Sequence, residues 1–245
     1  MSDSLLLDVQ GVSKYFGGLR ANEDVSFQVK RGEIVSIIGP NGAGKSTLFS
    51  CLTGFHRVDK GRLLFKGRDI TNRKPHTIAR LGIVRTFQVV QVISDMTVLE
   101  NVMTGGFLRR TRVEDVRRKA EEVLAFSGLI EKRSYNALEL TIADKKRLEV
   151  SMALAMEPEL LMLDESMAGL TPVELRQIIE LIRKVRATAV TVVVEHVMEA
   201  VMELSDRVIV LNSGRKIMEG APKQVVENPE VRRAYLGERY SAVSQ

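Results

Sequence analysis

The sequence predicts an α/β fold: a parallel-sheet core follows an antiparallel β subdomain and is interrupted by an inserted α-helical lobe. Three observations predict it. Residues 5–69 alternate short β-like runs with turn residues, residues 98–156 carry apolar side chains at helical spacing, and apolar strands alternate with helices after residue 157. The chain has 245 residues, 44% of them hydrophobic, which is enough for a single domain with a sizeable core.

The first part, residues 5–88, supplies the β-rich segment and the start of the core. Its β-like runs are residues 6–9, 25–29, 34–38 and 63–65, with turn residues at 17–18, 30–33 and 59–61. The run 34–38 is followed by a glycine-rich stretch and then by a helix-like apolar segment. This order predicts a strand, a tight loop and a helix.

The helical lobe is predicted over residues 98–156. Apolar side chains recur there on one helix face, as at Val113, Val116, Ala120, Val123 and Leu124. Residues 157–240 form the second part of the core and end in a C-terminal helix. Its expected strands are 160–163, 190–194 and 207–211, and its other expected helices are 172–186 and 197–204. We expect one domain over residues 1–245, without a flexible linker.

Composition narrows the classes of partner. The net charge of +5 and the pI near 9.4 permit contact with nucleic acid or with an anionic membrane surface. An aromatic content of 5% without Trp argues against nucleic acid, because base stacking needs aromatic side chains. The basic run 109–119 is interrupted by acids and favours a solvated helix face, with membrane or partner contact as the alternative. Cys51 stands alone and is expected in the core, with a reactive thiol as the alternative.

A phosphate-binding loop follows the apolar run 34–38. Its residues match the pattern G-x-x-x-x-G-K-[ST] and are Gly39, Pro40, Asn41, Gly42, Ala43, Gly44, Lys45, Ser46 and Thr47. Backbone N–H groups of such a loop and of the next helix converge on phosphate oxygens. Lys45 is expected to reach the β- and γ-phosphates, and the Ser46 hydroxyl to ligate Mg²⁺. The sequence therefore predicts binding of a nucleoside triphosphate.

Two acids end the apolar run 160–163, roughly 120 residues after the loop. A parallel strand presents its carboxyl end on the side where ligands bind, so Asp164 and Glu165 are expected beside the phosphate loop. Asp164 is predicted to hold Mg²⁺, and Glu165 to act as the general base for an attacking water. Taken alone, such acids could simply cap the next helix.

Gln88 and His196 complete the predicted hydrolysis site. The Gln88 amide could ligate Mg²⁺ and hold a water, and His196 follows the run 190–194 at another strand end, where it could bond a γ-phosphate. Either residue alone would be unremarkable, since surface Gln and structural His residues are common. Their combination with the loop and the acids favours hydrolysis.

This set of motifs resembles the ATP-binding subunits of ABC transporters. The phosphate loop, Gln88, the acidic strand end and His196 match the family's Walker A, Q-loop, Walker B and H-loop in order. The similarity is to ATPases of branched-chain amino-acid importers, and the segments that carry it are residues 16–19, 39–47, 82–88, 96–102 and 234–238. The resemblance implies that Phe16, or alternatively Tyr15, stacks on adenine. The alternative for Phe16 is a core position in the N-terminal sheet.

The resemblance also implies partners and a location. Two such subunits close head to tail around two ATP molecules, and their motion drives two transmembrane permease subunits that receive solute from an external binding protein. The chain would then lie peripherally on the cytoplasmic face of a prokaryotic cell membrane. It has no apolar stretch near the roughly 20 residues of a transmembrane segment. The solute would not touch this chain, so no residue identifies it.

One segment departs from the family. In place of L-S-G-G-Q or L-S-Y-G-Q, the chain has Leu140, Thr141, Ile142, Ala143 and Asp144. The pattern still predicts a helix start, and Thr141 and Ala143 are expected to face the partner's nucleotide. The Ala143 methyl and the Asp144 charge are expected to weaken that anion site, with an offset of the charge by Lys145, Lys146 or Arg147 as the alternative. We therefore expect two unequal sites, with a heterodimer favoured and a homodimer possible. Ser166 replaces the usual Pro after the acidic pair.

Other classes remain as alternatives. The altered segment leaves open a regulatory subunit that hydrolyses ATP weakly or not at all, and an exporter or lipid-handling system is a further possibility. About 50 residues separate the Q-loop from the signature, too few for the coiled coil of chromosome-organising relatives. Translation-associated relatives usually carry two such domains in one chain, and the length here allows one.

Overall fold

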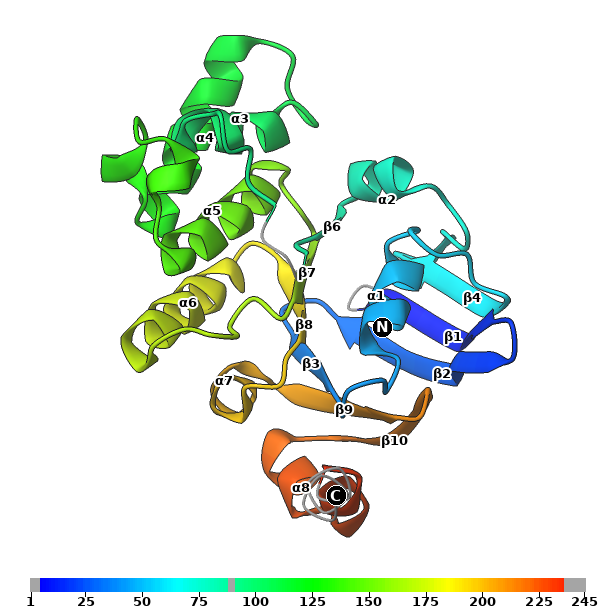
Figure 1. Ribbon diagram of the computed structural model, residues 1–245. Coiled ribbons are helices and arrows are strands. Elements are labelled where there is room, and N and C mark those ends of the chain that lie inside the picture. Colours follow the sequence, from blue (N-terminus) through cyan, green and yellow to red (C-terminus); the bar gives the residue numbers. More distant parts are fainter. Residues whose placement is uncertain (1–4, 88–90, 236–245) are drawn as a thin grey trace.

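The computed structural model describes residues 5–87 and 91–235. It contains two β-sheets and a helical lobe (Figure 1). Gln88 and the segment 236–238 of the family resemblance lie outside the described residues.

The first sheet is antiparallel and has the strand order β2-β1-β4-β5. Its strands are β1 (Leu5–Phe16), β2 (Leu19–Lys30), β4 (Lys60–Phe65) and β5 (Arg68–Asp69). Alternating side chains such as Val25, Phe27 and Val29 are buried, while their neighbours face outward. The buried face packs with Phe49 and Leu52 of helix α1 (Lys45–Leu52) in one hydrophobic cluster. The predicted antiparallel subdomain is present.

The second sheet has six strands in the order β10-β9-β3-β8-β7-β6. Five are parallel, and β10 pairs antiparallel with β9 at the edge. They are β3 (Ile34–Ile38), β6 (Ile83–Arg85), β7 (Leu160–Asp164), β8 (Val190–Val194), β9 (Arg207–Asn212) and β10 (Arg215–Gly220). All residues of β3, β7 and β8 are buried, as expected for parallel strands covered on both faces. The α/β fold predicted from the sequence is confirmed.

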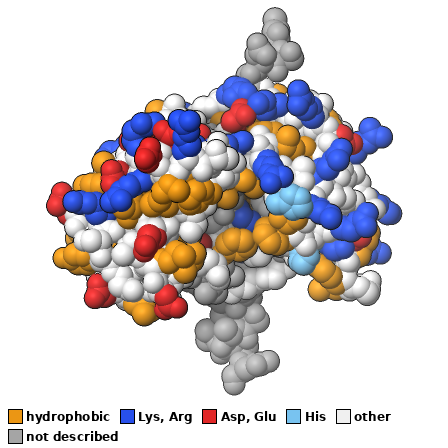
Figure 2. All heavy atoms as spheres, turned by 90° about the horizontal axis from the view of Figure 1, so that it is seen from above, with side chains coloured by type: hydrophobic (Ala, Val, Ile, Leu, Met, Phe, Trp, Pro, Cys, Tyr) orange, Lys and Arg blue, Asp and Glu red, His pale blue; other side chains and the backbone are white. Residues whose placement is uncertain are grey.

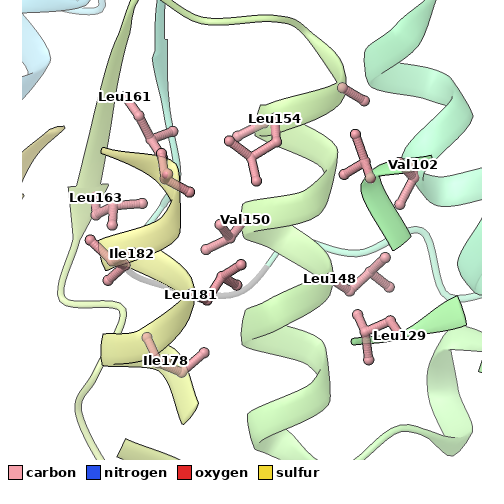
Figure 3. Close-up of a cluster of buried hydrophobic side chains, with 14 of the residues drawn as sticks. Val102, Leu129, Leu148, Val150, Leu154, Leu161, Leu163, Ile178, Leu181 and Ile182 are labelled. Carbon is pink, nitrogen blue, oxygen red and sulfur yellow. The ribbon is translucent and has the colours of Figure 1, made fainter. Parts of the chain in front are cut away.

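The helical lobe consists of α3 (Val98–Gly106), α4 (Val113–Ser127) and α5 (Ile142–Ala155), with short 3₁₀ turns at Ile130–Lys132 and Ala137–Glu139. A capping box between Thr97 and Glu100 starts α3. The lobe shares one hydrophobic cluster with β7 and α6 (Pro172–Val185). Figure 3 shows Leu148, Val150 and Leu154 of α5 between lobe residues and the side chains of Leu161 and Ile182. Helix α5 thus joins the lobe to the core.

Helices α2 (Pro75–Leu81), α7 (Met198–Leu204) and α8 (Pro222–Glu227) lie outside the lobe, and residues 229–235 are also helical. Helix α2 lies on the side of the molecule that faces the lobe, and α8 lies beyond β10 at the opposite end (Figure 1). The basic run 109–119 is largely paired with acids, as in Arg118–Asp115 and Arg110–Glu157, which supports a solvated helix face. Among residues 5–87 and 91–235, no helix is long and apolar enough to cross a membrane.

Candidate functional site

The phosphate loop joins β3 to α1 at the carboxyl end of a central strand. Two of its glycines have no room for a side chain. A Cβ atom at Gly39 would lie 2.2 Å from the Leu211 carbonyl oxygen, and one at Gly44 would lie 2.2 Å from the Ala21 carbonyl oxygen. Helix α1 begins directly after Gly44, with the exposed Ser46 in its first turn. The start of a helix leaves N–H groups without intrahelical partners, which is the arrangement that binds phosphate.

Lys45 lies inside this loop. Its side chain is only 7% exposed, and Nζ donates hydrogen bonds to the carbonyls of Gly39 at 2.7 Å and Pro40 at 3.0 Å. The buried Asn22 of β2 donates from Nδ2 to the Gly44 carbonyl at 3.1 Å and ties the loop to the antiparallel sheet. Backbone carbonyls of the loop therefore hold the side chain of the predicted phosphate-binding lysine.

Asp164 ends β7 and is buried. Its Oδ2 accepts a hydrogen bond from Arg85 Nη2 at 2.8 Å, whereas its Oδ1 is buried without a hydrogen-bond partner among the described residues. Burial raises the pKa of Asp164, and the Arg85 guanidinium acts in the opposite direction. A buried carboxylate oxygen without a partner is costly unless something binds it.

These residues fit a magnesium ion. Magnesium prefers oxygen ligands and takes one or two from the protein, with phosphates and water supplying the rest. Asp164 Oδ1 and the exposed Ser46 hydroxyl are such oxygens. No cluster of three or more His, Cys, Asp or Glu side chains forms a metal site in the part of the chain that the structure describes, and this mode of binding requires none.

Glu165 follows β7 in a strained conformation, with φ of 49°. A non-glycine residue in this region costs about 1–3 kcal/mol and is typical of functional turns. Its N–H donates to the Val194 carbonyl at 2.9 Å, which joins the ends of β7 and β8. His196 follows β8 two residues later and is exposed. The structure thus brings Asp164, Glu165 and His196 to the edge of the sheet where β3 enters the phosphate loop.

The loop after Glu165 is held from two sides. The fully buried Glu195 accepts hydrogen bonds from the N–H of Met167 at 2.8 Å and from the N–H of His196 at 3.3 Å. Lys146 Nζ donates to the Ala168 carbonyl at 2.5 Å. Burial raises the pKa of Glu195, because the charged form is poorly solvated there. Glu195 therefore links the His196 backbone to the loop that carries the predicted base.

Phe16 lies at the end of β1 and is 43% exposed. Its ring meets His56 edge to face with centroids 5.3 Å apart, and Lys14 Nζ lies 5.1 Å from its centroid. The alternative of a core aromatic is therefore wrong, and the ring is able to stack on a planar base. Tyr15 is partly buried, with Lys60 Nζ 5.9 Å from its ring centroid.

Glu149 of α5 holds the chain on both sides of residues 88–90. Its Oε1 accepts from the N–H of Phe87 at 2.8 Å, and its carboxylate also bonds the Gln91 backbone. The side chain is 7% exposed, and burial raises its pKa to about 7. Glu149 thus ties Phe87 and Gln91 to the helical lobe.

The altered signature starts α5 as predicted, because Thr141 Oγ1 accepts from the N–H of Asp144 at 3.2 Å. The Asp144 charge is offset by neighbouring cations, one of which is Arg147, as the sequence left open. Its carboxylate is buried in the lobe and forms ion pairs with Lys132 and Arg147. Burial alone would raise the pKa of Asp144, but these two cations outweigh it and lower that pKa. The charge is therefore balanced within the lobe.

The Ala143 methyl does not project outward either, because the side chain is 3% exposed. Ala143 is therefore not an exposed contact point of the signature segment. Ile142, in contrast, is 67% exposed, and Thr141 is exposed as well.

A groove separates the helical lobe from α2. It encloses a cavity of about 370 Å³ with a mainly apolar lining, including Phe55, Pro75, Ala79, Phe87 and Met152. Figure 2 views the molecule from the side of the lobe and α2, and hydrophobic side chains border a hollow near the centre of this face. Arg85 and Glu149 also line the groove, so it adjoins residues that contact Asp164 and Phe87.

Sequence reasoning identified the loop and the two acids but missed several supporting residues. They are Asn22, Arg85, Lys146, Glu149 and Glu195. Arg85 and Glu195 stand at the ends of apolar strands, which is an ambiguous signal, and the other three residues lack even that context. Ser166 is also buried, and its hydroxyl has no hydrogen-bond partner within the described ranges.

Comparisons with known proteins agree with the family resemblance found in the sequence. A family model described as "ABC transporter" matches residues 22–168, and one described as "Branched-chain amino acid ATP-binding cassette transporter" matches residues 215–241. The high-affinity branched-chain amino acid transport ATP-binding protein LivG of Escherichia coli (strain K12) is 41% identical over 250 residues, covering 95% of this chain and 98% of LivG. BraF of Pseudomonas aeruginosa, with the same description, is 37% identical and covers 95% and 98%.

Solved structures of ATP-binding cassettes superpose on nearly the whole of this chain. A nucleotide-free ATP-binding cassette from an ABC transporter superposes with a TM-score of 0.87 at 33% identity, covering 94% of this chain and 98% of that one. The ADP conformation of MJ1267, also an ATP-binding cassette of an ABC transporter, gives a TM-score of 0.87 at 33% identity and covers 95% and 99%.

Proposed function

This chain belongs to the ATP-binding cassette family of ABC transporters, and we propose that it hydrolyses ATP to drive import of branched-chain amino acids or another small polar solute. The observation that carries the proposal is the meeting of the phosphate loop with Asp164 and Glu165 at one sheet edge, where Asp164 keeps one unpartnered carboxylate oxygen. Relatives named for branched-chain amino-acid transport support the choice of solute.

Each predicted residue has a role in this reaction. The loop from Gly39 to Thr47 binds the triphosphate, and Lys45 contacts the β- and γ-phosphates. Ser46, Asp164 and Gln88 would hold magnesium, which would neutralise charge on the phosphates when bound.

Around the reacting phosphate, Glu165 accepts a proton from the attacking water and His196 donates a hydrogen bond to the γ-phosphate. The exposed ring of Phe16 stacks on adenine. The left-handed backbone of Glu165, directly after β7, is typical of functional turns and supports this role.

The groove between the lobe and α2 is the proposed docking site for one of two transmembrane permease subunits. Its apolar lining, which includes Phe87 directly before Gln88 in the chain, supports this assignment. The assembly would lie on the cytoplasmic face of a prokaryotic cell membrane and receive solute from a binding protein on the other side.

A second ATP-binding subunit completes each site, and we favour a heterodimer with two unequal sites. The basis of the inequality differs from the sequence expectation. Lys132 and Arg147 engage the Asp144 carboxylate, so we do not ascribe the inequality to its charge. The carboxylate offers no N–H donor where the family has a Gln amide, and Ile142 projects a large apolar side chain. The site completed by this signature is therefore expected to be the weaker one.

Two measurements test these proposals. Tagged protein purified from native membranes is expected to bring permease subunits and a different ATP-binding subunit, and vesicles containing the complex should take up labelled leucine with ATP. Recovery of an exporter permease would contradict the import proposal, and recovery of a homodimer would contradict the heterodimer.

In the assembled complex, Glu165→Gln should remove most turnover and Asp144→Ala should change it modestly. Equal, near-total loss from both changes would refute the asymmetry.

A further inference from the structure

Arg85 lies between the apolar groove and the magnesium-binding carboxylate. It ends β6, and its side chain is 9% exposed. Nη2 donates to Asp164 Oδ2 at 2.8 Å, and Nη1 lies 3.3 Å from the hydroxyls of Ser50 and Thr53 on α1 and its end. The guanidinium is thus attached both to the predicted metal ligand and to the helix that follows the phosphate loop.

Two aromatic rings hold the same guanidinium on the groove side. Its central carbon lies 5.4 Å from the centroid of the Phe55 ring and 4.9 Å from that of Phe87. The two rings meet edge to face with centroids 5.6 Å apart. Both rings line the groove, and Phe55 is 51% exposed. A cation between aromatic rings is attracted by both, so the rings and the guanidinium hold one another in place.

We propose that Arg85 is a positioning residue that links the groove to magnesium: it holds Asp164 Oδ2 so that Oδ1 remains the acceptor for the ion, and a segment docked on Phe55 and Phe87 acts on Asp164 through this side chain. The inference rests on the proposed function for the docked permease segment and for magnesium. The contact between Arg85 and Asp164 involves this chain alone.

The geometry gives the reason. Asp164 is buried, and a carboxylate has two equivalent oxygens that could each face the ion or turn away. Arg85 engages one oxygen and leaves the other without a partner among the described residues. Partners that orient a metal ligand from outside the first coordination shell typically contribute about 10–100-fold to metal affinity. Loss of Arg85 should therefore lower magnesium affinity more than nucleotide affinity.

The first experiment uses the isolated full-length chain and a fluorescent ATP analogue, titrated with MgCl₂ and separately in EDTA. Arg85→Gln is expected to raise the magnesium concentration at half-saturation by about 10-fold or more while changing binding in EDTA by less than about twofold. Arg85→Lys should recover part of the magnesium effect, because it restores a cation to Asp164. Arg207→Gln, which breaks the Arg207–Glu33 pair at a different strand, is the control and should leave both titrations unchanged.

Equal weakening with and without magnesium, or no weakening, would overturn the proposal. If Arg85→Gln does not fold, Arg85→Lys still decides: one ammonium group cannot make all the contacts of the guanidinium with Asp164, Ser50 and Thr53, so its magnesium concentration at half-saturation should lie above that of the wild type. A wild-type magnesium requirement in Arg85→Lys, together with unchanged EDTA binding, would also overturn it.

The second experiment tests the groove in the assembled complex. Phe55→Ala removes one ring, and Phe107→Ala, an exposed aromatic of the lobe outside the groove lining, is the control. Phe55→Ala should raise the magnesium requirement of the complex while Phe107→Ala does not, and equal magnesium curves would overturn the link to the groove. If no permease is recovered, the proposed function fails, but the titrations of the isolated chain still test Arg85.

Discussion

Replacement of Glu149 by Gln tests how burial in the helical lobe shifts the pKa of this carboxyl group. Glu149 is 7% exposed, and burial raises its pKa from 4.5 to about 7. The folded state therefore keeps a proton that the unfolded state loses between these two values. Stability is unaffected below the unfolded pKa, falls as the pH rises from 4.5 to 7, and stays reduced above the folded pKa.

The size of the effect follows from the shift. At 1.36 kcal/mol for each unit, the full penalty is roughly 3 kcal/mol, of which about 2.5 kcal/mol develops between pH 5 and pH 8. Glutamine cannot ionise but can still accept the N–H of Phe87. The difference in unfolding free energy between Glu149→Gln and the wild type should therefore shift by about 2–3 kcal/mol in favour of the variant when the pH rises from 5 to 8.

Urea unfolding of the isolated chain at both pH values measures this difference. Glu180→Gln, a change on the exposed face of α6, serves as the control and should follow the wild type at each pH. If the unfolding free energies of wild type and Glu149→Gln differ by the same amount at pH 5 and pH 8, the reasoning about burial is refuted.

Three further changes probe other parts of the site. Lys45→Ala should lower ATP affinity about 10–100-fold by calorimetry, because a charge-assisted contact is worth roughly 1.5–3 kcal/mol; unchanged affinity would exclude Lys45 from the phosphate site. Phe16→Leu should weaken a fluorescent ATP analogue about 3–10-fold, since aromatic stacking contributes about 0.5–1.5 kcal/mol beyond burial, whereas Phe16→Tyr should bind normally. Cys51 is buried and burial raises its pKa to about 11, so the folded chain should resist a thiol reagent at pH 8 and react only in denaturant; rapid labelling of folded protein would contradict its core position.

Local motifs explain what the sequence could predict. The phosphate loop and the pair Asp164 and Glu165 stand at the ends of continuous apolar runs, and that context can be seen without tertiary information. The central strands were identified for the same reason. Strand β6 has three residues and β10 is a partly exposed edge strand, so neither carries the pattern of a buried strand.

Side-chain direction explains what it could not predict. Asp144 was expected to face phosphate, but Lys132 comes from a 3₁₀ turn that only the folded lobe brings beside it. Arg85 looked like one of many arginines until β6 and β7 placed it against Asp164. Such partners arise from packing between distant segments, and a single sequence contains no local signal for them.

Phosphate release by the assembled complex is the measurement that tests the central claim most directly. Under single-turnover conditions with magnesium and ATP, Glu165→Gln should bind ATP as tightly as the wild type but release phosphate at least about 100-fold more slowly, as expected when a general base is lost. Phosphate release at the wild-type rate would contradict the assignment of Glu165 as the catalytic base of an ATP-driven importer.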